Sequence, residues 1–333
     1  MAIPTHYRAL VVSQPKPKSF VRAIIDKDTA DLGNDDLLVK VQYSSLNYKD
    51  ALSATGHPGV TRQFPHTPGI DAAGEVISCD SGAFSPGDQV LITGFDLGME
   101  TDGGWGELIR IPSSWAVSRP QELSARSATA LGTAGFTAAL SLQALERSGV
   151  LPDAGEIVVT GASGGVGSLA VGMLAKRGYQ VVAVSGKPEK EPLLRALGAT
   201  QIISREELIA NNHRPLLPER WAGGIDVAGG ELLSAVLKTT RYGGTVTCCG
   251  LVGSADLNIN VFPFILRGVT LCGIDSVNYP LDKRSALWQR MATELYPDAI
   301  EPLVREITLE QLEDSIQAML AGETAGRIVV RHG

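Results

Sequence analysis

The sequence predicts an α/β protein of two domains, in which a β-rich front part is followed by a doubly wound parallel sheet. Residues 1–127 carry short alternating apolar runs divided by Gly, Pro and Asp turns, a pattern typical of an all-β domain. In residues 128–270, strand-like and helix-like runs alternate, as in the βαβ units of a parallel sheet. A chain of 333 residues also suits two domains of ordinary size.

The elements follow in order along the chain. The front domain is expected to contain strands at residues 37–46, 72–79 and 88–93. The middle part begins with a helix-like run, ATALGTAGFTAALSLQALE, and later alternates through GGIDVAGG, ELLSAVLKTTRY and GGTVTCCGLVG. Residues 271–333 hold too few elements for a third domain: helix-like runs at 285–295 and 309–320, and a final strand at 326–332. We therefore expect this last part to return to the front domain.

Residues 157–167, IVVTGASGGVG, lead from an apolar strand through a glycine-rich turn into a helix. Gly164 and Gly165 let the backbone approach a pyrophosphate, and Gly167 lets the helix pack closely against the strand. Ala162 stands where the first glycine of such a turn usually lies. A strand-to-helix turn without a ligand is the alternative. A second β-rich run at βαβ spacing favours a dinucleotide site.

The residues after that second strand predict which dinucleotide is bound. Enzymes that use NAD carry Asp or Glu about 20 residues beyond the glycine turn, to bind the ribose hydroxyls. Here the sequence reads Ser185-Gly186-Lys187, without a carboxylate. We expect Ser185, Lys187 and the later Arg205 to bind a 2′-phosphate, so that NADPH is preferred over NADH.

Composition restricts the partners and the compartment. The chain has 36 acidic and 29 basic residues, a net charge of −7, which argues against nucleic acid or an anionic membrane as the main partner. Its start lacks the features of a signal peptide, and no apolar run reaches the roughly 18 residues of a membrane span, so a cytoplasmic protein is expected. The cysteines, which form no CxxC pair and are expected to be small buried residues with free thiols, are Cys79, Cys248, Cys249 and Cys272.

Several separate motifs together resemble the medium-chain dehydrogenase/reductase superfamily. They are SSLNYKDAL (44–52), FPHTPGIDAAGEV (64–76), FSPGDQVL (84–91), GTAGFTA (132–138) and TGASGGVG (160–167). The resemblance implies a GroES-like β-barrel-type domain and a Rossmann doubly wound parallel sheet. The segments SLNYKD, WAGGIDVAGG and PFILRGVTLCGIDSV resemble the zinc-independent acryloyl-CoA reductase branch, which includes quinone oxidoreductase-like proteins of the YhdH and YhfP type.

The residues at the superfamily's zinc positions predict chemistry without a metal. Zinc alcohol dehydrogenases place Cys, His and Cys where this chain has Asn47, Ile70 and Ala134. Residues 94–107 also lack the cysteines of a structural zinc lobe. Without a metal to polarise a carbonyl, hydride must go to a carbon that is already electrophilic. This favours a C=C conjugated to a carbonyl or thioester, or a quinone.

The resemblance points to two catalytic candidates. Tyr48 would contact the nicotinamide end of NADPH, and its phenol could donate a proton or a hydrogen bond; ring packing at a domain seam is the alternative. Asp71, next to a lost zinc-ligand position, could orient Lys49 or a water, or be a turn carboxylate. His57 and His66 are expected to be solvent-exposed loop residues.

The resemblance and the spacing also imply a set of cofactor contacts. Besides Tyr48, the implied cofactor-binding residues are Thr137, Ser163, Gly164, Gly165, Val166, Ser185, Gly186, Lys187, Arg205, Leu251, Ile265, Ser276 and Arg327. For Thr137 the alternative is helix capping only. Arg327 would otherwise be a solvated residue beside the final strand. Leu251 and Ile265 would otherwise be core residues.

The function that the resemblance implies is NADPH-dependent reduction of acryloyl-CoA to propionyl-CoA. One alternative is an NADPH:quinone or 2-alkenal oxidoreductase that uses the same site. Another is a nucleotide-binding structural or sensing protein without catalysis, against which the intact SLNYKD and glycine-turn segments argue. No motif marks a CoA pocket. A homodimer is expected, formed through an edge strand near residues 270–277.

Overall fold

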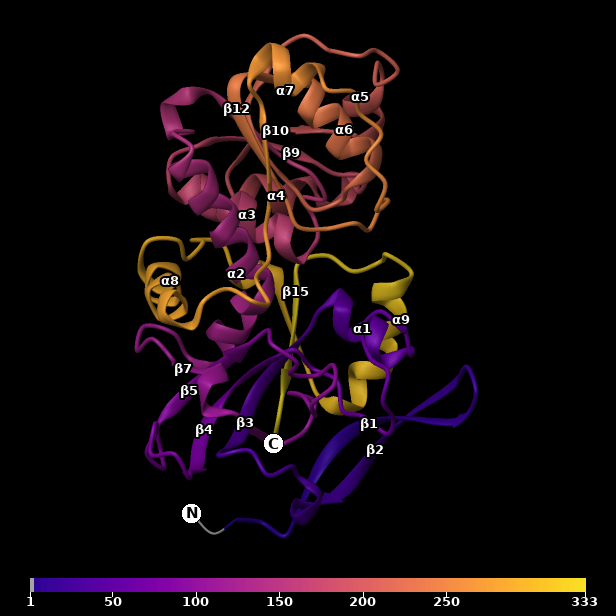
Figure 1. The fold of residues 1–333 in the computed structure, drawn as a ribbon, viewed down its shortest axis with the longest axis vertical. Coiled ribbons are helices and arrows are strands. Elements are labelled where there is room, and N and C mark those ends of the chain that lie inside the picture. Colours follow the sequence, from indigo (N-terminus) through magenta and orange to yellow (C-terminus); the bar gives the residue numbers. More distant parts are fainter. Residues whose placement is uncertain (1–2) are drawn as a thin grey trace. The chain divides into compact units, whose positions relative to one another are not determined.

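The computed structural model describes residues 3–333 and divides into two compact units (Figure 1). The first unit comprises the residues up to Thr133 together with Val277–Gln289 and Val304–Gly333. The second unit comprises Ala134–Ser276 and Arg290–Leu303. Each unit has its own sheet, and each is described separately below.

These units differ in detail from the boundaries expected from the sequence. Residues 128–133 belong to the first unit, whereas the sequence pattern assigned them to the middle domain. Residues 271–276 and 290–303 belong to the second unit, whereas the sequence pattern predicts that all of residues 271–333 return to the front domain.

The second unit is built on a six-stranded sheet in which every pair of neighbours is parallel. The strands are β8 (Glu156–Val159), β9 (Gln180–Val184), β10 (Ala199–Ile203), β11 (Trp221–Asp226), β12 (Thr240–Cys248) and β13 (Thr270–Gly273). Their spatial order, β10-β9-β8-β11-β12-β13, is the 3-2-1-4-5-6 order of dinucleotide-binding sheets. The predicted Rossmann doubly wound sheet is confirmed.

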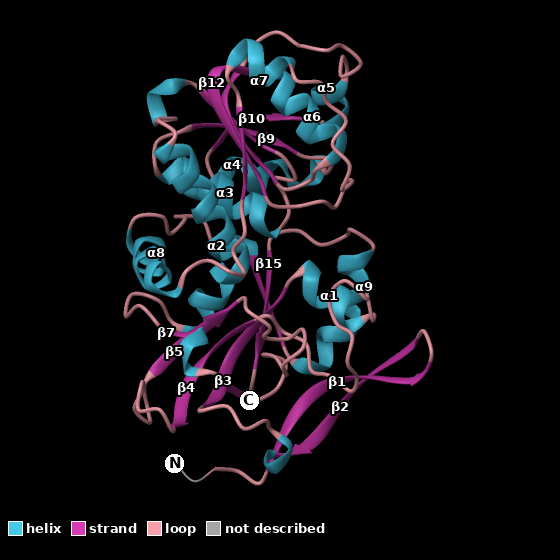
Figure 2. Ribbon diagram, in the orientation of Figure 1, coloured by secondary structure: helices cyan, strands magenta, loops and turns pink. Residues whose placement is uncertain are grey.

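Helices lie on both sides of this sheet (Figure 2). They are α3 (Gly165–Lys176), α4 (Glu191–Ala196), α5 (Arg205–Ile209), α6 (Gly230–Thr239) and α7 (Phe262–Arg267). Because both faces are covered, the strands are near-continuous apolar runs; Ile157, Val158 and Val159 are all fully buried. Burial of β-branched side chains on both faces therefore explains the strand runs seen in the sequence.

The first unit contains a seven-stranded sheet and a separate hairpin. The sheet runs β14-β15-β3-β4-β5-β7, and β6 also pairs with β3. Its strands are β3 (Leu37–Leu46), β4 (Asp71–Cys79), β5 (Gln89–Thr93), β6 (Leu108–Ile111), β7 (Ala116–Ser118), β14 (Val304–Ile307) and β15 (Arg327–Arg331). The hairpin is formed by β1 (His6–Lys16) and β2 (Ser19–Asp28).

The C-terminal strand β15 pairs antiparallel with β3, and this pairing brings the chain end back to the front domain. Two helices belong wholly to this unit: α1 (Tyr48–Ala54) and α9 (Leu312–Leu320). A third, α8 (Leu281–Thr293), begins in the first unit. The core of the unit packs one face of the sheet against α1 and α9, with Leu46, Trp105 and Ile328 among its members.

Helix α2 (Ala125–Arg147) is interrupted at Gly132, whose φ of 50° and ψ of −156° are not helical. By length and composition it is the one helix within residues 3–333 that could cross a membrane, and 89% of its most apolar window is buried in the protein. The core helix of a soluble protein passes the same test. The division between the two units falls directly after this interruption, between Thr133 and Ala134.

The burial predicted for His66 and for the four cysteines differs from that in the structure. His66 is 4% exposed rather than a solvent-exposed loop residue, because its backbone pairs with Val12 and its Nε2 lies 2.9 Å from the Gly98 carbonyl oxygen. His57 is exposed, as expected. The four cysteines are free, as predicted, but they are half-buried rather than buried.

Candidate functional site

In the second unit, the predicted glycine turn connects β8 to α3. A Cβ atom at Gly167 would lie 2.3 Å from the carbonyl oxygen of Gly161, so only glycine lets α3 pack this closely against the turn. Gly164 is the N-cap residue of α3 and supplies no side-chain cap. The first N–H groups of this helix are therefore available to an anion, and their partial positive charge favours a phosphate.

The loops after β8 and β9 come together with the start of α5. The Ser185 hydroxyl donates to the Ser163 hydroxyl at 3.3 Å, and the Lys187 backbone N–H donates to the Ser185 hydroxyl at 3.1 Å. A Cβ atom at Gly186 would lie 3.0 Å from Nε of Arg205, so the guanidinium lies over this glycine. The residues that the sequence predicts for binding a 2′-phosphate thus lie close together in the structure.

Two further residues of the second unit that were predicted to bind the cofactor contact each other. The Thr137 hydroxyl donates to the Ser276 hydroxyl at 2.9 Å. Thr137 lies inside α2, well beyond the interruption at Gly132, so the alternative that it caps a helix is wrong. Leu251 and Ile265 are 66% and 67% exposed, which makes the alternative core assignment wrong as well. Contact of these four residues with a cofactor stays a prediction.

Sequence reasoning missed a buried carboxylate at the end of β11. Asp226 is fully buried; its Oδ1 accepts from the Thr160 hydroxyl at 2.6 Å and its Oδ2 from the Gly229 N–H at 2.7 Å. Burial raises its pKa. Asp226 therefore ties the turn after β11 to the loop after β8. Its place in GGIDVAGG, where a β-rich run meets glycines, is the signal that could have found it.

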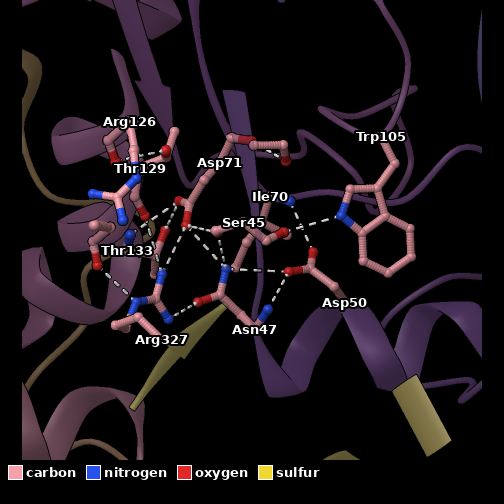
Figure 3. Close-up of polar contacts among 12 residues, drawn as sticks. Ser45, Asn47, Asp50, Ile70, Asp71, Trp105, Arg126, Thr129, Thr133 and Arg327 are labelled. Atoms are coloured by element: carbon pink, nitrogen blue, oxygen red, sulfur yellow. Dashed lines mark hydrogen bonds and ion pairs between the residues drawn. The ribbon is translucent and has the colours of Figure 1, made fainter. Parts of the chain in front are cut away.

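In the first unit, a network of buried polar side chains surrounds Asp71, the first residue of β4 (Figure 3). Asp71 is fully buried, and its Oδ2 accepts from the Ser45 hydroxyl at 2.6 Å and from Nδ2 of Asn47 at 2.9 Å. Its Oδ1 accepts from the hydroxyl and the backbone N–H of Thr133, at 2.6 Å and 3.0 Å. It makes no hydrogen bond with Lys49 among the described residues, and a catalytic role for Asp71 stays a prediction.

Asn47 lies between two carboxylates. Its backbone N–H and its Nδ2 both donate to Oδ2 of Asp50, at 2.7 Å and 3.1 Å, and Nδ2 also donates to Asp71. Asp50 accepts a further bond at Oδ1 from the Ile70 N–H, at 2.8 Å. Both Ile70 and Ala134 present buried apolar side chains. At the three sequence positions that the resemblance matches to zinc ligands, the chain therefore has an amide hydrogen-bonded to its neighbours and two apolar side chains.

Arg327 completes the network from β15 (Figure 3). It is 2% exposed, so the alternative of a solvated arginine beside the last strand is wrong. Its Nη1 donates to Oδ1 of Asn47 at 2.9 Å, and its Nη2 forms an ion pair with Oδ2 of Asp71 at 3.8 Å. The cation offsets the charge of the buried carboxylates. Its contact with a cofactor stays a prediction.

Tyr48 is the first residue of α1, directly after Asn47. Its side chain is 42% exposed and makes no hydrogen bond within residues 3–333, so the phenol can reach a ligand. Among the same residues, no three His, Cys, Asp or Glu side chains gather in a way that could hold a metal ion. The expected absence of zinc in the purified protein stays a prediction.

Asp50 predicts a pH dependence of stability. Burial and the charge of Asp71 raise its pKa from 3.8 to about 7, so the folded protein holds this proton more tightly than the unfolded chain does. Its contribution to stability is full below pH 3.8 and is lost as the pH rises to about 7. We expect the advantage of wild type over Asp50→Asn in unfolding free energy, measured with urea, to shrink by roughly 1 kcal/mol or more across this window.

Asp153→Asn, a change at an exposed position of the second unit, is the control. The same pH series on this variant gives the baseline. A difference between wild type and Asp50→Asn that does not change with pH would contradict the assignment.

Comparison with known proteins agrees with this geometry. A family model described as zinc-binding dehydrogenase matches residues 165–293, and one described as alcohol dehydrogenase GroES-like domain matches residues 33–121. Fold and matches together define a two-domain oxidoreductase. The chain belongs to the medium-chain dehydrogenase/reductase family, and the predicted GroES-like fold of the front domain is confirmed.

Three relatives are similar over nearly the whole chain. Acrylyl-CoA reductase AcuI of Ruegeria pomeroyi is 42% identical over 97% of this chain and 98% of its own. The yhdH oxidoreductase of Salmonella enterica, solved in complex with NADP, has a TM-score of 0.94 and 42% identity, over 98% of this chain and 100% of that one. Bacillus subtilis yhfP, solved with NAD bound, has a TM-score of 0.96 and 42% identity, over 99% of this chain and 100% of that one.

Proposed function

We propose that this protein is an NADPH-dependent enoyl-thioester reductase that converts acryloyl-CoA to propionyl-CoA without a metal. The observation that carries the proposal is the environment of Asn47, which stands at a position that the resemblance matches to a zinc ligand. Its amide nitrogen donates to Asp50 and Asp71, and its amide oxygen accepts from Arg327. Without a Lewis acid, the substrate must contain an electrophilic carbon of its own, as the β-carbon of an enoyl thioester is. The similarity to acrylyl-CoA reductase AcuI supports this substrate class.

The residues of the second unit fit a dinucleotide phosphate. The turn at residues 161–167 has no room for a Cβ at Gly167, and the first N–H groups of α3 are uncapped by a side chain. We propose that Ser163, Gly164, Gly165 and Val166 hold the pyrophosphate, and that Ser185, Gly186, Lys187 and Arg205 hold the 2′-phosphate. The relatives were solved with either NADP or NAD bound. The two basic side chains and the absence of a carboxylate after β9 favour NADPH.

A Lys187→Glu variant tests this cofactor choice. We expect its kcat/KM with NADPH to fall about 10- to 100-fold, the usual value of a charge-assisted hydrogen bond, while its kcat/KM with NADH stays the same or rises. Lys190→Glu makes the same charge change three residues later and is the control. Equal efficiency of wild type with both nucleotides, unchanged in Lys187→Glu, would contradict the assignment.

In the proposed reaction, residues of the chain stabilise the developing negative charge and supply a proton. When bound, NADPH supplies the hydride that adds to the β-carbon. Negative charge develops on the thioester oxygen, and backbone N–H groups and the exposed Tyr48 phenol are the proposed donors to it. Tyr48 or water delivers a proton to the α-carbon, which completes the saturated thioester. Asp71 is fully buried and accepts four hydrogen bonds, so we assign it a positioning role.

The alternative, an NADPH:quinone or 2-alkenal oxidoreductase, is favoured by the name of the Bacillus subtilis relative already described. The name of YhfP places it among quinone oxidoreductases, and its sequence is 44% identical over 91% of this chain. NADPH oxidation should be measured with acryloyl-CoA, other enoyl-CoAs, a simple quinone and a 2-alkenal, each with and without a chelator. We expect acryloyl-CoA to give the highest kcat/KM and the chelator to have no effect. Fast quinone turnover without acryloyl-CoA turnover would favour the alternative, and no turnover at all would favour a binding protein.

We also propose a homodimer formed through the edge strand β13. Before it in the chain, α7 and the loop after β12 carry exposed apolar side chains that are not among the predicted cofactor contacts: Val252, Val261, Phe262 and Leu266. Exposed apolar side chains close in sequence to a strand that pairs on only one side suit a second copy of the chain. Light scattering should give a dimer for wild type and for the control Leu151→Arg, and a monomer for Leu266→Arg. A monomeric wild type would contradict the proposal.

A further inference from the structure

The interruption of α2 at Gly132 creates two helix ends inside the first unit. Such ends leave the carbonyls of the preceding turn and the N–H groups of the following turn without partners in the helix. Arg327 donates from Nε to the Ala130 carbonyl at 2.8 Å and from Nη2 to the Thr129 carbonyl at 3.3 Å. Asp71 accepts the N–H and the hydroxyl of Thr133 on the other side of the break. Both ends are thus satisfied by side chains from distant strands.

The charges of these side chains match the ends that they contact. The C-terminal end of a helix favours a cation and the N-terminal end favours an anion. Arg327 lies at the carbonyl end and Asp71 at the N–H end, and the two form an ion pair at 3.8 Å. Because both are almost completely buried, loss of either one would leave an uncompensated charge in the core.

The break also needs glycine. The φ of Gly132 is +50°, which L side chains rarely adopt. A Cβ atom at this position would lie 2.4 Å from Oδ2 of Asp71 and 3.0 Å from Nη2 of Arg327. The backbone conformation and the ion pair therefore depend on each other.

Asn47 joins this arrangement to the start of α1. Its Oδ1 accepts from Arg327 and its Nδ2 donates to Asp71, both at 2.9 Å. Its backbone N–H is held by Asp50, and the next residue is Tyr48. The position of the first residue of α1 is thus linked through Asn47 to the helix break.

We propose that Asn47, Asp71 and Arg327 form a clamp that holds the break in α2 and the first turn of α1, and so positions the Tyr48 phenol. Arg327 is then a positioning residue that acts through Asn47 rather than a ligand of the cofactor. The effect on turnover rests on the proposed function, whereas the coupling within the clamp does not.

The test compares Arg327→Met, Gly132→Ala and the double variant. Arg331→Met, an exposed arginine of the same strand that pairs with Glu306, is the control. Three quantities are measured: kcat and KM with acryloyl-CoA, the Kd of NADPH by fluorescence, and the unfolding equilibrium constant in urea. We expect each single variant to lower kcat about 100-fold, as a displacement of roughly 1 Å does, with the Kd of NADPH within about threefold of wild type.

The double variant should have a kcat no lower than that of the slower single variant, and it should be no less stable than the less stable one. The unfolding constant would then depart from additivity by about 3- to 100-fold. An increase of about tenfold or more in the Kd of NADPH for Arg327→Met but not for Gly132→Ala would make Arg327 a cofactor ligand and overturn the proposal. Additive effects on the unfolding constant would also overturn it.

If these variants do not fold, Thr133→Val replaces them, since it removes only the hydroxyl that donates to Asp71. A smaller drop in kcat with an unchanged Kd would support the clamp, and unchanged kcat would contradict it. If wild type shows no turnover of acryloyl-CoA, the proposed function fails. The coupling between Arg327→Met and Gly132→Ala in unfolding still decides whether the clamp exists.

Discussion

A Gly167→Ala enzyme is expected to bind NADPH about 10- to 100-fold more weakly than wild type, because overpacking of a tight site typically costs 1–3 kcal/mol. The added Cβ would lie 2.3 Å from the carbonyl oxygen of Gly161, and a backbone atom cannot yield without moving the turn. The first N–H groups of α3 would then no longer converge on the phosphate. Fluorescence titration with NADPH measures the affinity, and thermal unfolding checks that the variant is folded.

Gly33→Ala is the matched control, because a Cβ at Gly33 meets no atom within 4 Å. It should bind NADPH as wild type does. If a folded Gly167→Ala variant kept the wild-type affinity, the turn would not be the phosphate site.

A Tyr48→Phe enzyme is expected to lose about 100- to 1,000-fold in kcat with acryloyl-CoA, the usual cost of removing one donor to a developing oxyanion. The phenol is the exposed polar group at the start of α1, and the substitution removes its hydroxyl while keeping the ring. Steady-state kinetics at saturating NADPH gives kcat and KM separately.

Tyr242→Phe, at a position that is 78% exposed in the second unit, is the control and should leave both constants unchanged. An unchanged kcat in Tyr48→Phe with a raised KM would indicate that the ring only packs against a ligand. Tyr48 would then no longer be a donor, but the reaction itself would stand.

Most of the fold could be predicted because its signals are local. The strand at residues 37–46 was expected with the bounds of β3, since its apolar residues and flanking turns lie within ten positions of one another. The glycine turn at 161–167 is likewise a local pattern. The bounds of the two units were harder to predict, because the interruption of α2 at Gly132 reads in the sequence as one continuous helix.

The site was predictable only in part, because only some of its residues lie close together in the sequence. The proposed phosphate-binding residues 163–166 and 185–187 lie within or directly after one βαβ unit, β8-α3-β9, so their proximity follows from local sequence spacing. The clamp joins Asn47 to Arg327, which lie 280 residues apart, through a hydrogen bond that no local pattern reveals. His66 was misassigned for a related reason: its partners, Val12 and Gly98, come from other parts of the front domain.

Transfer of deuterium from NADPH distinguishes metal-free hydride addition to an enoyl thioester from quinone reduction. The enzyme, treated with a chelator, is given acryloyl-CoA and NADPH that carries deuterium at the transferred position of C4, and the thioester product is analysed by mass spectrometry. Metal-free hydride addition to the conjugated β-carbon predicts propionyl-CoA with one deuterium at C3 and none at C2. Absence of labelled propionyl-CoA, while a simple quinone consumes the same NADPH, would contradict the account.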